Sequence, residues 1–140
     1  NDGILTVFQK IPSELTDKAE TLLKFVGLHQ KRKLRAGDLS FGQQKLLELA
    51  MALMNEPKML LLDEPTAGIN PTLINGIIDR LISVNKDYGI TLLVIEHNMK
   101  VIMNLAQRVF CLAHGQMLAN GTPKEIKNDK RVLDAYLGAQ

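Results

Sequence analysis

The sequence has few features of secreted, membrane-spanning or polyanion-binding proteins. Its 140 residues contain one cysteine, Cys111, so an internal disulfide is excluded. No apolar run approaches the roughly 20 residues needed to cross a bilayer, and no stretch has the pattern of a secretory signal peptide. Seventeen Lys and Arg against fifteen Asp and Glu leave a net charge of +2, which gives little attraction to polyanions. We therefore expect a cytosolic domain that binds no nucleic acid.

What remains is an ordinary globular composition. Apolar residues make up 46% of the chain and charged residues 23%, values typical of folded domains. The length suffices for one domain with a real core but not for two large ones. The basic cluster at residues 31–35 is expected to be a solvated loop, and Cys111, within an apolar run, an inert core residue. The chain begins Asn1-Asp2-Gly3, which suggests that it is part of something longer.

One stretch organises the rest of the chain. Four apolar residues run into two carboxylates and a proline in Met59-Leu60-Leu61-Leu62-Asp63-Glu64-Pro65. This short, Leu-rich run predicts a buried strand of a parallel sheet, whose carboxyl end is where open α/β sheets bind ligands. Residues 90–95 form a second such run, and His97 follows it. We expect Asp63, Glu64 and His97 at one sheet edge, although the first run alone also fits a core strand ending in two solvated acids.

Apolar spacing and capping residues predict the remaining elements. Helices are expected at residues 16–26, 41–54, 71–86, 98–106 and 130–137, and strands at 58–62, 90–95 and 108–113, with a hairpin turn at His114-Gly115 into 116–119. Thr16 or Asp17, Ser40 and Asn70 stand where helix caps stand, and Thr122 begins a capping box. Alternation of strands and helices predicts an α/β fold with a parallel sheet.

Four segments in chain order resemble the second half of an ABC-type ATPase domain. Leu39-Ser40-Phe41-Gly42-Gln43 is similar to the signature motif, the strand ending at Asp63-Glu64 to Walker B, Ala67-Gly68-Ile69-Asn70 to the D-loop, and His97 to the switch histidine. The resemblance covers nearly all 140 residues but only about the C-terminal half of the family's domain. It implies the C-terminal part of a P-loop NTPase ABC domain, with a mainly parallel sheet flanked by helices and a β-hairpin near the C-terminus.

The same resemblance implies a division of the chain into two parts. Residues 1–55 are expected to be part of the α-helical subdomain, including the signature motif and its helix. Residues 56–140 are expected to be the C-terminal part of the RecA-like core, with Walker B, D-loop, switch histidine and C-terminal helices.

The carboxylates suit phosphoryl transfer, which needs a metal to neutralise phosphate oxygens and a group to orient water. A carboxylate at a strand end can hold Mg²⁺ through a water, as Asp63 could, and Glu64 could act as general base. The resemblance implies that Asp63 is the metal-side carboxylate, Glu64 the catalytic base and His97 a contact of the γ-phosphate. His29 and His114 lack such a setting and are expected to be exposed loop residues.

The segment at residues 39–43 precedes a helix, whose free N–H groups and dipole form an anion site. An ordinary Ser-capped helix, with Ser40 as the cap, is the alternative. The resemblance implies that residues 39–43 bind the γ-phosphate of ATP held mainly by another subunit. Phe41 replaces the glycine most common there, and Asn70 replaces the commoner aspartate of the D-loop, where its role as a helix cap is equally compatible.

The phosphate loop is missing from the sequence. Such a loop needs Gly-x-x-x-x-Gly-Lys-Ser/Thr; residues 37–43 have the glycine spacing, but Gln43 stands where lysine must be. Gln9 lies too near Leu39 to be the family's Q-loop. We predict that this chain alone neither binds ATP tightly nor hydrolyses it.

The tail and two central segments narrow the resemblance. Residues 115–126 and 132–138, with 95–99 and 63–71, resemble importers of branched-chain or other hydrophobic amino acids. This implies an ATP-binding subunit that powers an importer, with ATP and Mg²⁺ as cofactors of the parent protein. The implied partners are a second ABC ATPase subunit, membrane permease subunits and, indirectly, a substrate-binding protein. Such a subunit is cytoplasmic and peripheral on the inner face of the membrane through the permease.

Two other functions stay open. One is a non-transport ABC ATPase of DNA repair or translation, which long coiled-coil insertions or a second cassette would support; the sequence has neither. The other is a non-catalytic interaction module.

A sheet cut from its upstream strands also leaves an unpaired edge, so we predict non-physiological self-association of the fragment.

Overall fold

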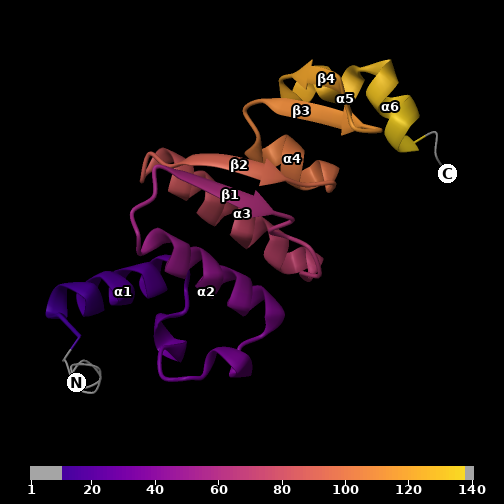
Figure 1. Cartoon of the computed structure of the whole chain (residues 1–140). Helices are drawn as coiled ribbons and strands as arrows, with labels where there is room; N and C mark the ends of the chain where they lie inside the picture. The colour runs from indigo at the N-terminus through magenta and orange to yellow at the C-terminus, as the bar shows by residue number, and fades with distance from the viewer. Residues whose placement is uncertain (1–10, 138–140) are drawn as a thin grey trace, which may run out of the picture.

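The computed structural model describes residues 11–137 (Figure 1). Gln9 and Gly138, considered above, lie outside the described residues. The elements in chain order are α1 Ser13–Phe25, the 3₁₀ turns η2 His29–Lys31 and η3 Ala36–Asp38, α2 Phe41–Leu53, β1 Met59–Asp63, α3 Pro71–Lys86, β2 Thr91–Ile95, α4 Met99–Leu105, β3 Val109–Ala113, β4 Gln116–Gly121, α5 Pro123–Asn128 and α6 Lys130–Leu137. None of the described helices combines the length and apolarity that a bilayer span requires.

Two small sheets carry the strands. β1 and β2 pair in parallel, and the crossover between them contains α3. β3 and β4 form an antiparallel hairpin, with an irregularity between Cys111 and Leu112. The predicted α/β fold with a parallel sheet flanked by helices and a C-terminal hairpin is confirmed.

The predicted caps agree with the structure except at the first helix. Asn70 caps α3, and capping boxes begin α2 at Ser40 and α5 at Thr122. The caps expected at Thr16 or Asp17 are wrong, because α1 already starts at Ser13 behind Pro12. The hydroxyl of Thr16 instead donates to the Pro12 carbonyl, 3.4 Å away within the first turn.

Other boundaries also shift for local reasons. The expected loop at residues 31–35 lies between two 3₁₀ turns, and its first residue ends η2. β4 extends beyond residue 119, because Asn120 and Gly121 still pair with Phe110 and Val109. His29 is half-buried rather than exposed, because its Nε2 contacts Glu20 on α1. His114 is exposed in its turn, and residues 31–35 are exposed as predicted.

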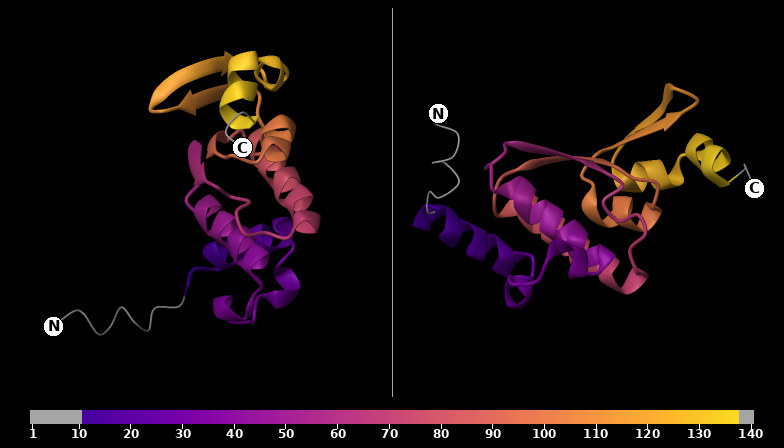
Figure 2. Two further views of the ribbon diagram at one scale, coloured as in Figure 1. Left: turned by 90° about the vertical axis from the view of Figure 1, so that its right-hand side faces the viewer. Right: turned by 60° about the horizontal axis from the view of Figure 1, so that its bottom comes forward.

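One main core joins the helices to the parallel sheet. Figure 2 shows α2 and α3 along the same side of β1 and β2. Leu81, Val84 and Val101 are the largest fully buried side chains of this core. It draws on residues from α1 through α4, so the boundary expected between residues 55 and 56 stays a prediction. A second cluster, formed by Cys111, Ala119, Ile126 and Val132, joins the hairpin to α5 and α6 and confirms Cys111 as a core residue.

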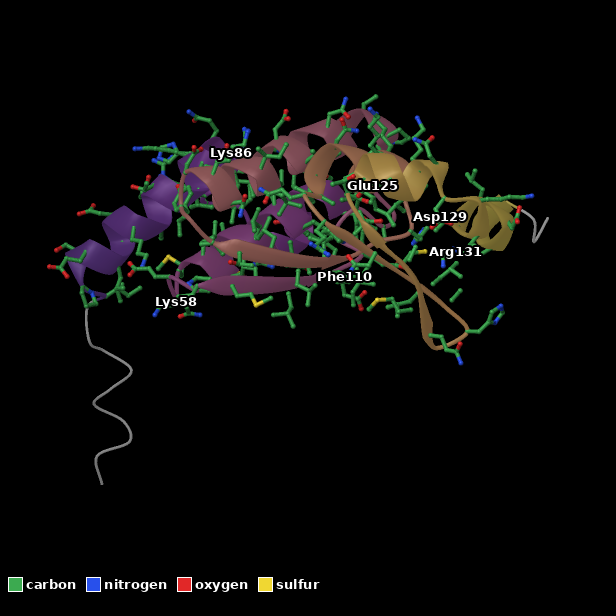
Figure 3. The ribbon with its side chains drawn as sticks, turned by 90° about the horizontal axis from the view of Figure 1, so that it is seen from above. Lys58, Lys86, Phe110, Glu125, Asp129 and Arg131 are labelled. Carbon is green, nitrogen blue, oxygen red and sulfur yellow. The ribbon has the colours of Figure 1, made fainter. Side chains whose placement is uncertain are left out.

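The expectation that β1 and β2 are buried strands is wrong for the described residues, because these cover only one face of the parallel sheet. Leu60 and its same-face neighbours pack into the main core. On the opposite face Met59, Leu61, Leu93 and Ile95 are exposed, Leu61 to 73%. Seen from above, the two strands lie along one margin of the described chain, beginning beside Lys58 (Figure 3). We call the side chains of Met59, Leu61, Leu93 and Ile95 the exposed apolar face.

Candidate functional site

The carboxyl ends of β1 and β2 lie side by side. The parallel register pairs Asp63, the last residue of β1, with Ile95, the last residue of β2. The ladder continues one step further, because the Glu64 N–H donates to the Ile95 carbonyl at 2.9 Å. The loops that follow both strands therefore start next to each other, as the sequence predicts for parallel strands.

Glu64 and His97 meet at this edge. Nδ1 of His97 lies 3.0 Å from Oε1 of Glu64, and both side chains are accessible, at 70% and 47% exposure respectively. Glu64 has a φ of +44°, a left-handed conformation uncommon for a side chain with a Cβ. The Ala67 N–H donates to the Glu64 carbonyl at 3.0 Å and closes the turn. The geometry gives an accessible carboxylate held by an imidazole.

Positive φ alone does not mark a functional residue. Glu56, in the turn after α2, has a φ of +49°, as does His114 in the hairpin turn. What sets Glu64 apart is the combination of this turn with the strand end and the imidazole of His97. This makes Glu56 a useful comparison residue.

Asp63 is exposed at the end of β1. No group of three or more His, Cys, Asp or Glu side chains in the described residues could hold a metal ion by itself. Mg²⁺ commonly binds through one or two carboxylates, waters and substrate phosphates rather than in an all-protein cage. The exposed Asp63 carboxylate at the strand end fits that mode and would hold such an ion.

The predicted signature segment forms the N-terminus of α2. The Gln43 N–H donates to Oγ of Ser40 at 3.4 Å, and Oε1 of Gln43 accepts from the Ser40 N–H at 3.1 Å. Lys31 Nζ also donates to this Gln43 oxygen at 3.3 Å. Nε2 of Gln44 donates to the carbonyls of Ala36 and Leu39, both at 3.2 Å, and so shapes the preceding turn.

Phe41 and Gly42 lie against the predicted D-loop. A Cβ built on Gly42 would stand 3.3 Å from Cδ1 of Leu73 and 3.7 Å from Ile69, and the Phe41 ring lies against Gly68. In residues 11–137 no hydrogen bond or ion pair joins residues 39–43 to Asp63, Glu64 or His97. The signature segment and the sheet edge are thus separate parts of the described chain.

Asn70, the last residue of the predicted D-loop, caps α3. Its Oδ1 accepts from the Thr72 N–H at 3.0 Å and from the Thr72 hydroxyl at 2.9 Å. This cap is one of the two compatible roles that the sequence predicts for Asn70.

Thr66 and Glu96 also belong to this edge, although nothing in the sequence alone marks them as site residues. Thr66 is buried, at 5% exposure, and both its N–H and its hydroxyl donate to Oε1 of Glu96. A carboxylate next to His97 and a threonine just after Pro65 were the available signals. Neither residue type is conspicuous without the pairing of the two strands.

Two models of known protein families match the sequence. The sequence model of the ABC transporter family matches residues 2–67. That of the branched-chain amino acid ATP-binding cassette transporter family matches residues 116–140. The two matches lie at opposite ends of the chain and point to the same class of protein.

The curated relatives that the chain matches are branched-chain amino acid transport ATP-binding proteins. The chain is 38% identical over 131 residues to the high-affinity branched-chain amino acid transport ATP-binding protein LivG of Salmonella typhimurium, a match that covers 94% of this chain and 51% of the relative. It is 39% identical over 129 residues to a probable LivG of Methanocaldococcus jannaschii, covering 89% of this chain and 50% of that protein. The chain thus spans about half the length of the curated relatives it matches.

Solved structures share the fold. An ATP-binding cassette of an ABC transporter in its ADP conformation superposes with a TM-score of 0.82 at 36% identity, covering 96% of this chain and 55% of that one. A nucleotide-free ATP-binding cassette gives 0.81 at 35% identity, covering 97% and 56%. With these sequence and structure matches, and with the strand-end carboxylates beside His97, the chain belongs to the ABC transporter family.

Proposed function

We propose that this chain is the C-terminal half of an ATP-binding subunit that hydrolyses ATP to power an importer of branched-chain amino acids. The observation that carries the proposal is the paired strand ends, which put Glu64 and His97 3.0 Å apart beside Asp63. The similarity to branched-chain amino acid transport ATP-binding proteins supports the substrate class.

Each residue of the edge has a role in this proposal. Mg²⁺, held by Asp63 when nucleotide binds, would supply neutralisation of phosphate charge. Glu64 orients the attacking water and accepts its proton as general base. His97 holds the Glu64 carboxylate in place and presents its ring to the γ-phosphate.

The signature segment acts on a different nucleotide. The N–H groups at the start of α2 and the dipole of this 13-residue helix favour a phosphate anion. Gly42 lacks a Cβ and so permits close approach of the backbone. Residues 39–43 close on ATP held mainly by a second ABC ATPase subunit, and Asn70, which caps α3 beside this segment, fixes the end of the D-loop there.

The assembly follows from the same proposal. The full subunit pairs with a second ATPase subunit and docks on membrane permease subunits at the inner face of the membrane. A substrate-binding protein delivers the amino acid to the permease. ATP acts as the ligand that shifts the two-state equilibrium of the pair. Without a phosphate loop this chain alone stays inactive.

Transport tests the proposal directly. A full-length cassette carrying this segment is expressed in a bacterium that lacks its own branched-chain importer ATPase, and uptake of radiolabelled leucine is measured. Wild-type protein should restore uptake. His97→Ala should abolish it, whereas His114→Ala, a change at an exposed histidine outside the edge, should not. Full uptake with His97→Ala would contradict the proposed site, and no uptake with active wild-type ATPase would contradict the substrate class.

A further inference from the structure

Glu96 is a half-buried carboxylate that the proposed function leaves without a role. Its Oε1 accepts from the Thr66 N–H at 3.3 Å and from the Thr66 hydroxyl. Its Oε2 accepts from the N–H groups of His97 and Asn98, both at 3.2 Å. Each carboxylate oxygen thus serves a different loop.

The two loops are those that carry the proposed catalytic residues. Thr66 lies two residues after Glu64 and four before Asn70. His97 and Asn98 begin the loop after β2, where Oδ1 of Asn98 accepts from the Lys100 and Val101 N–H groups at 3.0 and 3.4 Å and starts α4. Through Glu96, the backbone at His97 and Asn98 is tied to the buried Thr66, the residue just before the predicted D-loop.

We propose that Glu96 is a positioning residue whose bridge to Thr66 fixes His97 relative to Glu64 and couples that pair to the D-loop. The inference rests on the proposed function of Glu64 and His97. Both oxygens of Glu96 are engaged by the protein, so Glu96 acts through its neighbours and does not touch the reacting atoms.

The bridge needs a carboxylate rather than an amide. A glutamine has one acceptor oxygen and an NH₂ group that only donates. In Glu96→Gln the NH₂ group must face either Thr66, whose hydroxyl can turn to accept but whose N–H cannot, or the N–H groups of His97 and Asn98. At least one backbone N–H therefore loses its acceptor and one side of the bridge is weakened, while size and shape stay nearly the same.

Thr66 offers the complementary pair of changes. Thr66→Val keeps the branched shape and deletes the hydroxyl donor. Thr66→Ser deletes a methyl group and keeps the donor. If the hydrogen bond carries the effect, serine retains activity and valine does not.

A second Glu–Thr pair provides a matched control. Oε2 of Glu125 accepts from the N–H and hydroxyl of Thr122 at 2.7 and 2.9 Å. This is the same bonding as that of Glu96 with Thr66, but it lies in the C-terminal capping box. Glu125→Gln reports the loss of such a pair away from the site.

The experiment measures kcat and KM for ATP in a full-length cassette carrying this segment. Glu96→Gln and Thr66→Val should each lower kcat about 10- to 100-fold, the scale of a small misplacement of catalytic groups, with KM changed less than about twofold. Thr66→Ser and Glu125→Gln should stay near wild type. The double variant Glu96→Gln/Thr66→Val should fall no further than either single one, because both break one bridge.

The possible outcomes distinguish the positioning role of Glu96 from the proposed role of Glu64 in ATP hydrolysis. If Glu64→Gln abolishes hydrolysis while Glu96→Gln and Thr66→Val keep wild-type kcat, the positioning role is overturned and the proposed function stands. If Glu64→Gln hydrolyses ATP normally, the proposed function fails. Additive losses in the double variant would overturn the bridge. Should Glu96→Gln fail to fold, as circular dichroism would show, the Thr66 pair decides the question.

Discussion

The two faces of the β1–β2 sheet differ sharply although their residues are similar. Leu60 is 8% exposed and packs into the main core, whereas its neighbour Leu61 is 73% exposed. Both are leucines in the middle of one strand. The difference arises because α2 and α3 lie on one side of the sheet and no described element covers the other (Figure 2).

The strands carry apolar side chains on both faces of the sheet. Parallel strands are apolar on both faces because both are normally covered. The hairpin repeats the pattern, with Cys111 and Ala119 buried against α5 and α6 and with Phe110 and Leu112 exposed on the opposite face. Both strand pairs thus have apolar side chains on each face, as in a sheet that is covered on both sides. The described helices cover only one of these faces.

Truncation of one leucine on each face tests the comparison most strongly. Leu60→Ala should lower the free energy of unfolding by about 2–5 kcal/mol, because it removes packed methyl groups and leaves a cavity. Leu61→Ala should change it by less than about 0.5 kcal/mol. Urea unfolding of the two variants measures both values. Equal losses would show that the exposed apolar face is covered in solution.

A charge on the exposed apolar face should act on association rather than stability. The two strands pair only with each other among residues 11–137, so their outer edges and Ile95, 63% exposed, are open to a second copy. We expect wild-type chain to self-associate at high concentration, and Leu61→Lys and Ile95→Lys to shift light scattering toward monomer. Lys124→Arg, which keeps the charge at an exposed residue outside this face, is the control. A monodisperse wild-type monomer would contradict this prediction.

Lowering the pH should leave the difference in unfolding free energy between Leu60→Ala and Leu61→Ala almost unchanged. This is the smallest effect that we expect. Hydrogen bonds from Thr122 hold the pKa of Glu125 below its ordinary 4.5, and Arg131 lowers the pKa of Asp129 below 3.8. A carboxyl group whose pKa is lower in the folded than in the unfolded state stabilises the fold at pH values above its unfolded pKa. This stabilisation is lost as the pH falls through the folded pKa. Overall stability should thus drop below about pH 4.5, yet the gap between Leu60→Ala and Leu61→Ala should persist. Urea unfolding at pH 7 and pH 4 checks both; a closing gap would contradict the packing account.

Much of this arrangement was predictable because it rests on local signals. The caps at Ser40 and Asn70, the Leu-rich strand before Asp63 and the edge position of His97 follow from residue type and spacing. The start of α1 was misplaced because Thr16 and Asp17 look like caps, although Pro12 already begins the helix.

The contacts between distant segments could not be predicted from the sequence. The pairing of His29 with Glu20 and of Thr66 with Glu96 depends on how separate segments pack. The approach of Phe41 to Gly68 likewise brings together the first residue of α2 and a loop residue 27 positions further along the chain. No periodicity or capping rule encodes such contacts, so the bridge at the sheet edge emerged only with the fold.

The most direct test of the central claim is ATP hydrolysis by a full-length cassette carrying Glu64→Gln. Glu56→Gln is the matched control, because Glu56 has the same left-handed backbone, with φ of +49° against +44°, but lies away from the edge. Loss of a general base should lower kcat by about 10²- to 10⁴-fold in Glu64→Gln, and Glu56→Gln should hydrolyse ATP like wild type. Unchanged hydrolysis by Glu64→Gln would contradict the account.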